Sequence, residues 1–148
     1  MFIFGGAPSS SQYIIDQSLR FGRASGYFYK TLGTPTTQDT FTFSAWVKRS
    51  ALSSLQNIFG VSTNNSIGFP AADTLVVTLA GSATITTSGL YRDAGAWLHV
   101  VYRQTTGAAY LYVNGEQVGT SATVSAVFNT AVAHQIGAAN TSNYFLGY

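Results

Sequence analysis

The chain has 148 residues, of which 46% are hydrophobic, so it is long and apolar enough for one domain with a sizeable core. Only 8% of the residues are charged, against roughly 25% in ordinary soluble domains. The surface must therefore consist largely of hydroxyl, amide and glycine residues. The formal charge of +2 comes without a clustered basic patch, which argues against a nucleic-acid partner. The absence of cysteine excludes disulfides and fits folding in a reducing cytoplasm.

Residues 1–12 differ in composition from the rest, being apolar at first and then rich in glycine, proline and serine. They lack a basic leader and their apolar run is short, so we expect neither a signal peptide nor a membrane partner. Two interpretations stay open. The segment is a frayed terminus, or it is an arm that docks on a neighbouring molecule through Phe2, Ile3 and Phe4. The domain prediction is an arm at 1–12 and a single sandwich domain at 13–148.

Alternation of apolar and polar residues predicts many short strands, because successive side chains of a strand point to opposite faces. The clearest example is 41–49, where Phe41 and Phe43 alternate with Thr42, Ser44 and Trp46. The strands expected in chain order are 13–15, 18–21, 26–30, 41–49, 56–61, 67–69, 74–79, 83–87, 97–103, 109–113, 116–119, 134–137 and 144–147.

The stretch 97–119 is expected to form three strands joined by turns. Asn114-Gly115 suits a type I′ turn, since asparagine tolerates positive φ and glycine adopts it freely. Its inner face should belong to the core, and this face consists of Leu98, Val100, Tyr102, Leu111 and Val113. Tyr110 and Tyr112 then lie on the outer face, where contact with a partner or a sugar is expected.

Helical periodicity is weak throughout, and ten or more short strands with frequent turns predict an all-β fold. Four stretches together resemble the concanavalin A-like jelly rolls, in particular the laminin G-like branch found in phage and bacterial proteins. They are SLRF at 18–21, FTFSAWVKRS at 41–50, the Trp97…His99 strand with its Asn-Gly hairpin, and FLGY at 145–148. The resemblance implies a two-sheet antiparallel jelly-roll sandwich.

The resemblance also implies one departure at the C-terminal end. In relatives, the stretch similar to 145–148 leads into one more strand, whereas the given sequence stops at Tyr148. The last strand is absent, or a neighbouring chain supplies it, or the sequence is part of a longer protein. An unpaired sheet edge would invite strand addition by another chain.

Residues for catalysis and metal binding are sparse. Glycoside hydrolysis needs two facing carboxyl groups, and no expected strand carries paired acids among Asp16, Asp39, Asp73, Asp93 and Glu116. His99 and His134 lack ligand spacing, and His99 is expected to be structural. Asp73, Asp93 and Asn114 are scattered candidates for calcium, which wants six to eight oxygens. We therefore predict no enzyme activity, no metal site and no cofactor, with calcium as the weaker alternative.

Three aromatic residues, Trp46, Tyr110 and Tyr112, alternate away from the predicted core. They have three interpretations: a second apolar layer under loops, a subunit interface, which is typically enriched in Trp and Tyr, or a platform for sugar rings.

The phage-like resemblance, the charge-poor surface and the apolar arm predict a non-enzymatic structural protein of a phage virion. It would be a capsid decoration protein or a tail or fibre component, made in the host cytoplasm. Its partners would be other virion proteins and copies of itself, held through the arm and the sheet edge. The alternative is a lectin-like carbohydrate-binding adhesion module, for which a host surface glycan is the partner.

Overall fold

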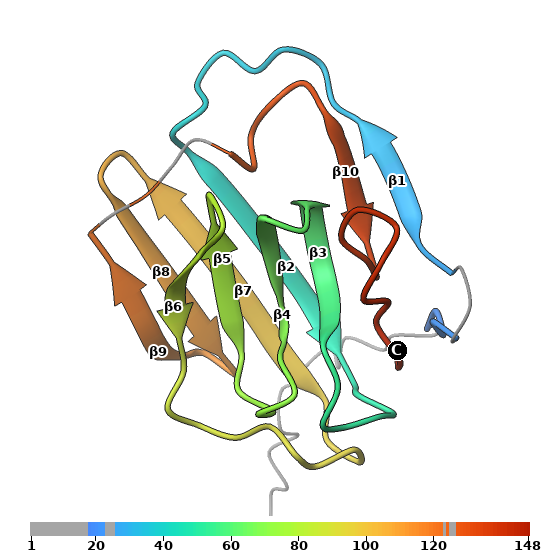
Figure 1. Ribbon diagram of the computed structural model, residues 1–148. Coiled ribbons are helices and arrows are strands. Elements are labelled where there is room, and N and C mark those ends of the chain that lie inside the picture. Colours follow the sequence, from blue (N-terminus) through green and yellow to red (C-terminus); the bar gives the residue numbers. More distant parts are fainter. Residues whose placement is uncertain (1–17, 23–25, 123, 125–126) are drawn as a thin grey trace, which may run out of the picture.

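The computed structural model describes residues 18–22, 26–122, 124 and 127–148 (Figure 1). The predicted arm, with Phe2, Ile3 and Phe4, lies outside the described residues, as does the strand expected at 13–15. Within the described residues there are ten strands and no helix. The described residues therefore contain no helix that is long and apolar enough to cross a membrane.

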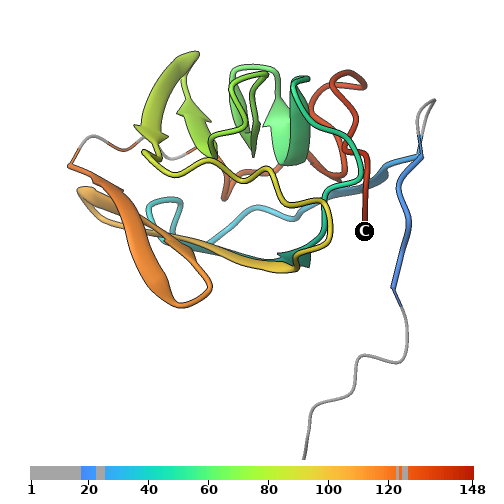
Figure 2. The same cartoon turned by 90° about the horizontal axis from the view of Figure 1, so that it is seen from below.

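The strands form two antiparallel sheets that pack face to face, which confirms the predicted two-sheet sandwich. Figure 2 shows β3–β6 in one layer and β7–β9 in the other. The six-stranded sheet has the order β1-β10-β3-β4-β5-β6 and the four-stranded sheet the order β2-β7-β8-β9. The strands are β1 (Phe28–Thr31), β2 (Phe41–Val47), β3 (Gln56–Ser62), β4 (Asn65–Phe69), β5 (Val76–Leu79), β6 (Ser82–Thr86), β7 (Leu98–Thr105), β8 (Ala108–Val113), β9 (Glu116–Ser121) and β10 (Ala133–Ile136).

The inner faces of both sheets form one core. Val100, Tyr102 and Leu111 are fully buried, as the alternation in 97–119 predicts. Toward one end of the sandwich the core is aromatic. The ring of Phe59 stacks on that of Phe43 at 4.9 Å between centroids and meets that of Phe128 edge-on at 5.4 Å. These rings join the two sheets, because Phe43 belongs to β2 and Phe59 to β3.

The β8–β9 hairpin has the predicted turn. Asn114 and Gly115 have φ values of 53° and 86°, so both lie in the left-handed region that a type I′ turn requires. The backbone N–H of Asn114 donates to the carbonyl of His99 at 2.9 Å. This bond ties the turn to the start of β7.

The end of the described chain runs beside the continuation of β2. Lys48 and Tyr148 exchange two backbone hydrogen bonds, both of 2.9 Å, and the N–H of Ser50 donates to the carbonyl of Leu146 at 2.8 Å. On its other side Gly147 pairs with Phe21. The strands expected at 18–21 and 144–147 are therefore present only as short bridges: Gly147 pairs with Phe21 and Arg49, whereas Tyr144 pairs with Asn57 of β3 in the six-stranded sheet.

Candidate functional site

The outer face of the four-stranded sheet carries the three aromatic residues singled out in the sequence. The strand register arranges its side chains in rows: Trp46 lies opposite His99, Ser44 and Val101 lie in one row with Tyr112, and Thr42 and Arg103 lie in one row with Tyr110. Gln117 and Thr120 of β9 continue the last two rows. We call these residues the outer face: Thr42, Ser44, Trp46, His99, Val101, Arg103, Tyr110, Tyr112, Gln117 and Thr120.

Trp46 is the most prominent side chain of the outer face, with 52% of its surface exposed. Its indole stacks on the imidazole of His99, with 4.9 Å between ring centroids and 19° between planes. His99 is itself fixed, because its Nε2 hydrogen-bonds with the hydroxyl of Ser44 at 3.0 Å and its backbone N–H donates to Oδ1 of Asn114 at 2.8 Å. The indole is therefore held in one orientation before any partner arrives, and His99 has the structural role that was expected.

Apart from its aromatic rings, the outer face carries mainly polar side chains. The guanidinium of the exposed Arg103 lies 5.9 Å from the ring centroid of Tyr110, at cation–π distance. Tyr110 and Tyr112 are half-buried and Gln117 is exposed. None of the outer-face residues is acidic. The face therefore offers aromatic surface, amide and hydroxyl groups and one cation, which suits binding and lacks the paired carboxylates of a glycoside hydrolase.

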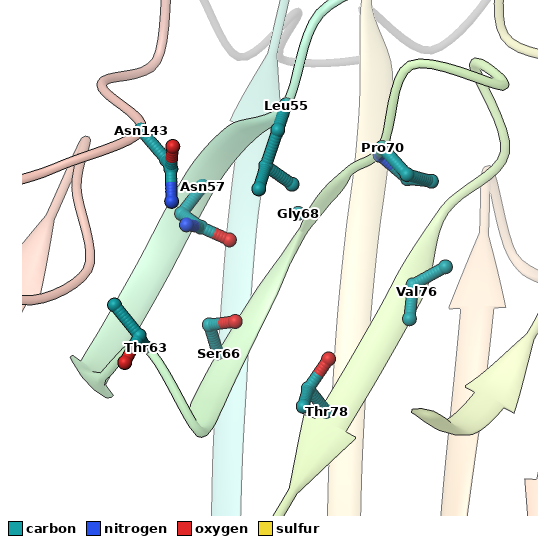
Figure 3. Close-up of a pocket in the computed structure, with 9 residues that line it drawn as sticks. All are labelled: Leu55, Asn57, Thr63, Ser66, Gly68, Pro70, Val76, Thr78 and Asn143. Atoms are coloured by element: carbon teal, nitrogen blue, oxygen red, sulfur yellow. The ribbon is translucent and has the colours of Figure 1, made fainter. Parts of the chain in front are cut away.

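A hollow of about 140 Å³ lies on the opposite side of the molecule, on the six-stranded sheet (Figure 3). Gly68 of β4 lines it, and β3 approaches this glycine so closely that a Cβ there would lie 2.4 Å from the carbonyl oxygen of Gln56. Asn57 and Asn143 lie at one side of the hollow and Pro70 and Val76 at the other (Figure 3). Its described lining has neither an aromatic ring nor a charge. A glycine within a predicted strand is the signal for such a close approach, and the sequence prediction did not use it.

Asp73, one of the calcium candidates, is buried among cations. Its Oδ1 accepts hydrogen bonds from Arg49 Nη2 at 2.9 Å and from the backbone N–H of Ser53 at 2.8 Å, and its Oδ2 accepts one from Arg92 Nε at 3.1 Å. The N–H of Ser53 and the two guanidinium groups hold the pKa of Asp73 below its usual value, although desolvation opposes them. Arg49 is equally buried and lies over the ring of Phe69, 4.4 Å from its centroid.

The other two calcium candidates also serve local structure. Oδ1 of Asp93 accepts the N–H of Gly95 at 2.7 Å, and Oδ1 of Asn114 is the acceptor for His99. His134 is buried, and its ring nitrogens bond with the carbonyls of Val132 and Phe128. In the part of the chain that the structure describes, no three acidic or histidine residues gather as metal ligands would.

A second pair of aromatic residues borders the outer face and was not among the predicted site residues. Trp97, directly before β7, is 42% exposed, and its ring centroid lies 6.4 Å from that of Tyr148. The guanidinium of Arg20 lies 5.8 Å from the ring centroid of Tyr148. Alternation already assigned Trp97 to the side opposite Leu98, but only the pairing of the chain end with Lys48 brings Tyr148 beside it.

Residues 22–148 match the family model described as the concanavalin A-like lectin/glucanases superfamily. The chain belongs to this laminin G-like family. Domain 4 of a GH43 extracellular arabinanase from Geobacillus stearothermophilus, solved with arabinotriose, is 18% identical with a TM-score of 0.59; the match covers 74% of this chain and 56% of that one. The CBM40 of a Ruminococcus gnavus sialidase, bound to α2,3-sialyllactose, is 14% identical with a TM-score of 0.57, over 74% of this chain and 71% of that one. No curated protein matches.

At these identities the solved structures establish a shared fold and nothing finer. The resemblance read from four sequence stretches is confirmed, both for the family and for the jelly-roll architecture. This chain spans little more than half the length of the arabinanase domain.

Proposed function

We propose that this protein is a non-catalytic carbohydrate-binding module and that a glycan lies on the outer face. The observation that carries the proposal is the exposed Trp46 indole, held by His99 at one end of a face that also displays Tyr112 and Tyr110. A pyranose or furanose ring has an apolar C–H face and a rim of hydroxyl groups. Flat rings with a few fixed polar groups between them match both parts.

The chemistry of the face supports binding without turnover. Trp46 would stack against one sugar ring, and the amide of Gln117 and the hydroxyl of Ser44 supply donors and acceptors for hydroxyl groups. Arg103 adds a cation at the Tyr110 end, which favours a glycan with a carboxylate there. No outer-face carboxylate is present to protonate a glycosidic oxygen or to attack the sugar.

The two similar solved structures favour this proposal over a role in a virion. The arabinanase domain is described in complex with arabinotriose and the CBM40 as bound to α2,3-sialyllactose, which are statements about those proteins. They support the lectin-like alternative for a chain of the same fold. A role in a phage virion, with other virion proteins or further copies of this chain as partners, stays a prediction from the sequence.

The test is a glycan array followed by calorimetry on the glycans that bind. We expect Trp46→Ala to weaken binding about tenfold or more, because most of the stacking surface is lost. Tyr29→Ala is the matched control, since Tyr29 is 71% exposed but belongs to β1 in the other sheet. Asn143→Ala is a second control, because Asn143 lines the hollow on the six-stranded sheet and lies away from the outer face.

Circular dichroism and thermal melting establish that each variant is folded. An array without any bound glycan contradicts the proposal. An equal loss of affinity in Tyr29→Ala would show that exposed aromatic side chains bind the glycan nonspecifically. A loss of affinity in Asn143→Ala alone would place the binding site in the hollow of the six-stranded sheet.

A further inference from the structure

The outer face carries a cation without an anionic partner. Among its residues, all of which lie in the described part of the chain, Arg103 is the one permanent cation and none is acidic. The two ion pairs found within the described residues join Arg49 and Arg92 to Asp73, so neither involves Arg103. The exposed guanidinium of Arg103 therefore has donors available for an anion that comes from outside.

The neighbouring carboxylate of Glu116 does not neutralise this face, although Glu116 directly precedes Gln117 in the chain. Glu116 pairs with Val113 across the β8–β9 turn. Cross-strand partners point to the same side of a sheet, and Val113 is buried in the core. Glu116 is thus directed away from the outer face, which keeps its positive charge and complements an anionic ligand.

Arg103 and Trp46 lie toward opposite ends of the outer face. Trp46 is opposite His99, and Arg103 follows His99 on the same strand, β7, after two further outward positions. Two such steps along a strand cover about 13 Å. One sugar ring is too small to touch both side chains, whereas several sugar units in line can do so.

The surface between these two ends suits a row of sugar rings. Val101 and Tyr112 lie in the row between Trp46 and Arg103, and both are half-buried. Ser44 and Gln117 lie in the same row on either side, and both are exposed. The path from one end to the other thus has a low, largely apolar floor with a hydroxyl and an amide at its margins.

We propose that the outer face binds an internal stretch of an unbranched polyuronate, a polysaccharide whose sugar units carry carboxylates. One unit stacks on Trp46, on the face of the indole that His99 leaves open, and the carboxylate of a later unit bonds with Arg103. This inference rests on the proposed function. It adds the class of glycan, a minimum length and the residue that selects for charge.

A single guanidinium favours a carboxylated chain over a sulfated one. The planar fork of Arg103 matches a carboxylate with two parallel hydrogen bonds. A densely charged chain is held by several cations at once, as nucleic acids are, and the outer face supplies one. The spacing along the face also favours an internal stretch over a single terminal acidic sugar.

The test measures affinity by calorimetry at low ionic strength. The probes are oligogalacturonates and oligomannuronates from the dimer to the hexamer. Their methyl esters have the same length without the charge, and heparin oligosaccharides are the sulfated comparison. We expect affinity for at least one uronate series to rise about tenfold or more between dimer and tetramer, because only the longer chain reaches both ends of the face.

Two variants assign the charge preference to one residue. Arg103→Gln should weaken binding of the uronate tetramer about tenfold and leave its methyl ester nearly unchanged. Lys30→Gln is the matched control, since Lys30 is also an exposed cation but belongs to β1 in the other sheet. Trp46→Ala should weaken the acid and the ester alike. Circular dichroism establishes that each variant is folded.

Several results would overturn this inference and leave the proposed function standing. Equal affinity for acid and ester, or an equal loss in Lys30→Gln and Arg103→Gln, removes the role of Arg103. Equal affinity for dimer and tetramer indicates a terminal sugar, and tighter binding of heparin indicates a sulfated chain. Binding of neutral glycans with none of either uronate series has the same consequence. A glycan array without any bound glycan contradicts both proposals.

Discussion

Asp73 joins three separate loops through its own atoms. Its backbone N–H donates to the carbonyl of Pro70 at 2.9 Å, its carbonyl accepts the N–H of Tyr91 at 2.8 Å, and its carboxylate bonds with Ser53. Its φ of 63° lies in the left-handed region, which aspartate tolerates better than most residues. A single residue, through its backbone and its side chain, thus connects the loops at one end of the sandwich, with Arg49 as its buried counter-ion.

The lowered pKa of Asp73 makes part of the stability depend on pH. In the unfolded chain the carboxyl titrates at about 3.9, above its folded value. Its contribution is therefore fully present above about pH 4 and is lost as the pH falls through the folded pKa. Urea unfolding between about pH 6 and pH 2 should show a steeper loss of stability below pH 4 in the wild type than in Asp73→Asn. Parallel curves for the two proteins would contradict this.

The sequence could not reveal the role of Asp73. Its partners Arg49 and Arg92 lie 24 and 19 residues away along the chain, in loops whose paths no periodicity describes. The outward orientation of Trp46, in contrast, could be predicted, because it follows from the alternation within a single strand. Its stacking on His99 still required the register between β2 and β7, which only the folded sheet supplies.

The β8–β9 turn is the element for which the sequence was most informative. Gly115 has a φ of 86°, and no heavy atom lies within 4 Å of the position that an added Cβ would take, so a side chain there would cause backbone strain and no clash. We expect Gly115→Ala to lower the free energy of unfolding by about 1–2 kcal/mol. Gly33→Ala is the control, since Gly33 also lies in open space and is outside the left-handed region. Equal effects of the two substitutions in urea unfolding would rule out strain as the cause.

Most strands were predicted within two residues of their observed ends, but sheet order was not. β5 begins at Val76 and not at residue 74, because the backbone N–H and C=O of Leu75 bond with Thr87. β10 lies between β1 and β3, so the chain returns from near its end to pair with two earlier strands. Local alternation says which face a residue occupies and nothing about such long-range neighbours.

Across the whole molecule, the two sheets depend on an aromatic residue that belongs to neither. Phe128 lies between β9 and β10, is fully buried, and packs edge-on against Tyr102 at 5.5 Å and Phe59 at 5.4 Å. We expect Phe128→Ala to cost about 3–5 kcal/mol in the free energy of unfolding. Leu90→Ala, at an exposed position, should stay within about 0.5 kcal/mol. A small effect of Phe128→Ala would show that the sheets hold together without this contact.

The chain has two tryptophans, and both lie at the surface, where they line one hollow of about 350 Å³ at the border of the outer face. Intrinsic fluorescence of the native protein therefore comes from indoles already in contact with water, and unfolding of the core changes it little. Any molecule that covers this corner removes that water. The tryptophan emission is thus a built-in reporter of occupancy: a shift to the blue signals that something has bound, while the fold itself is better followed by circular dichroism.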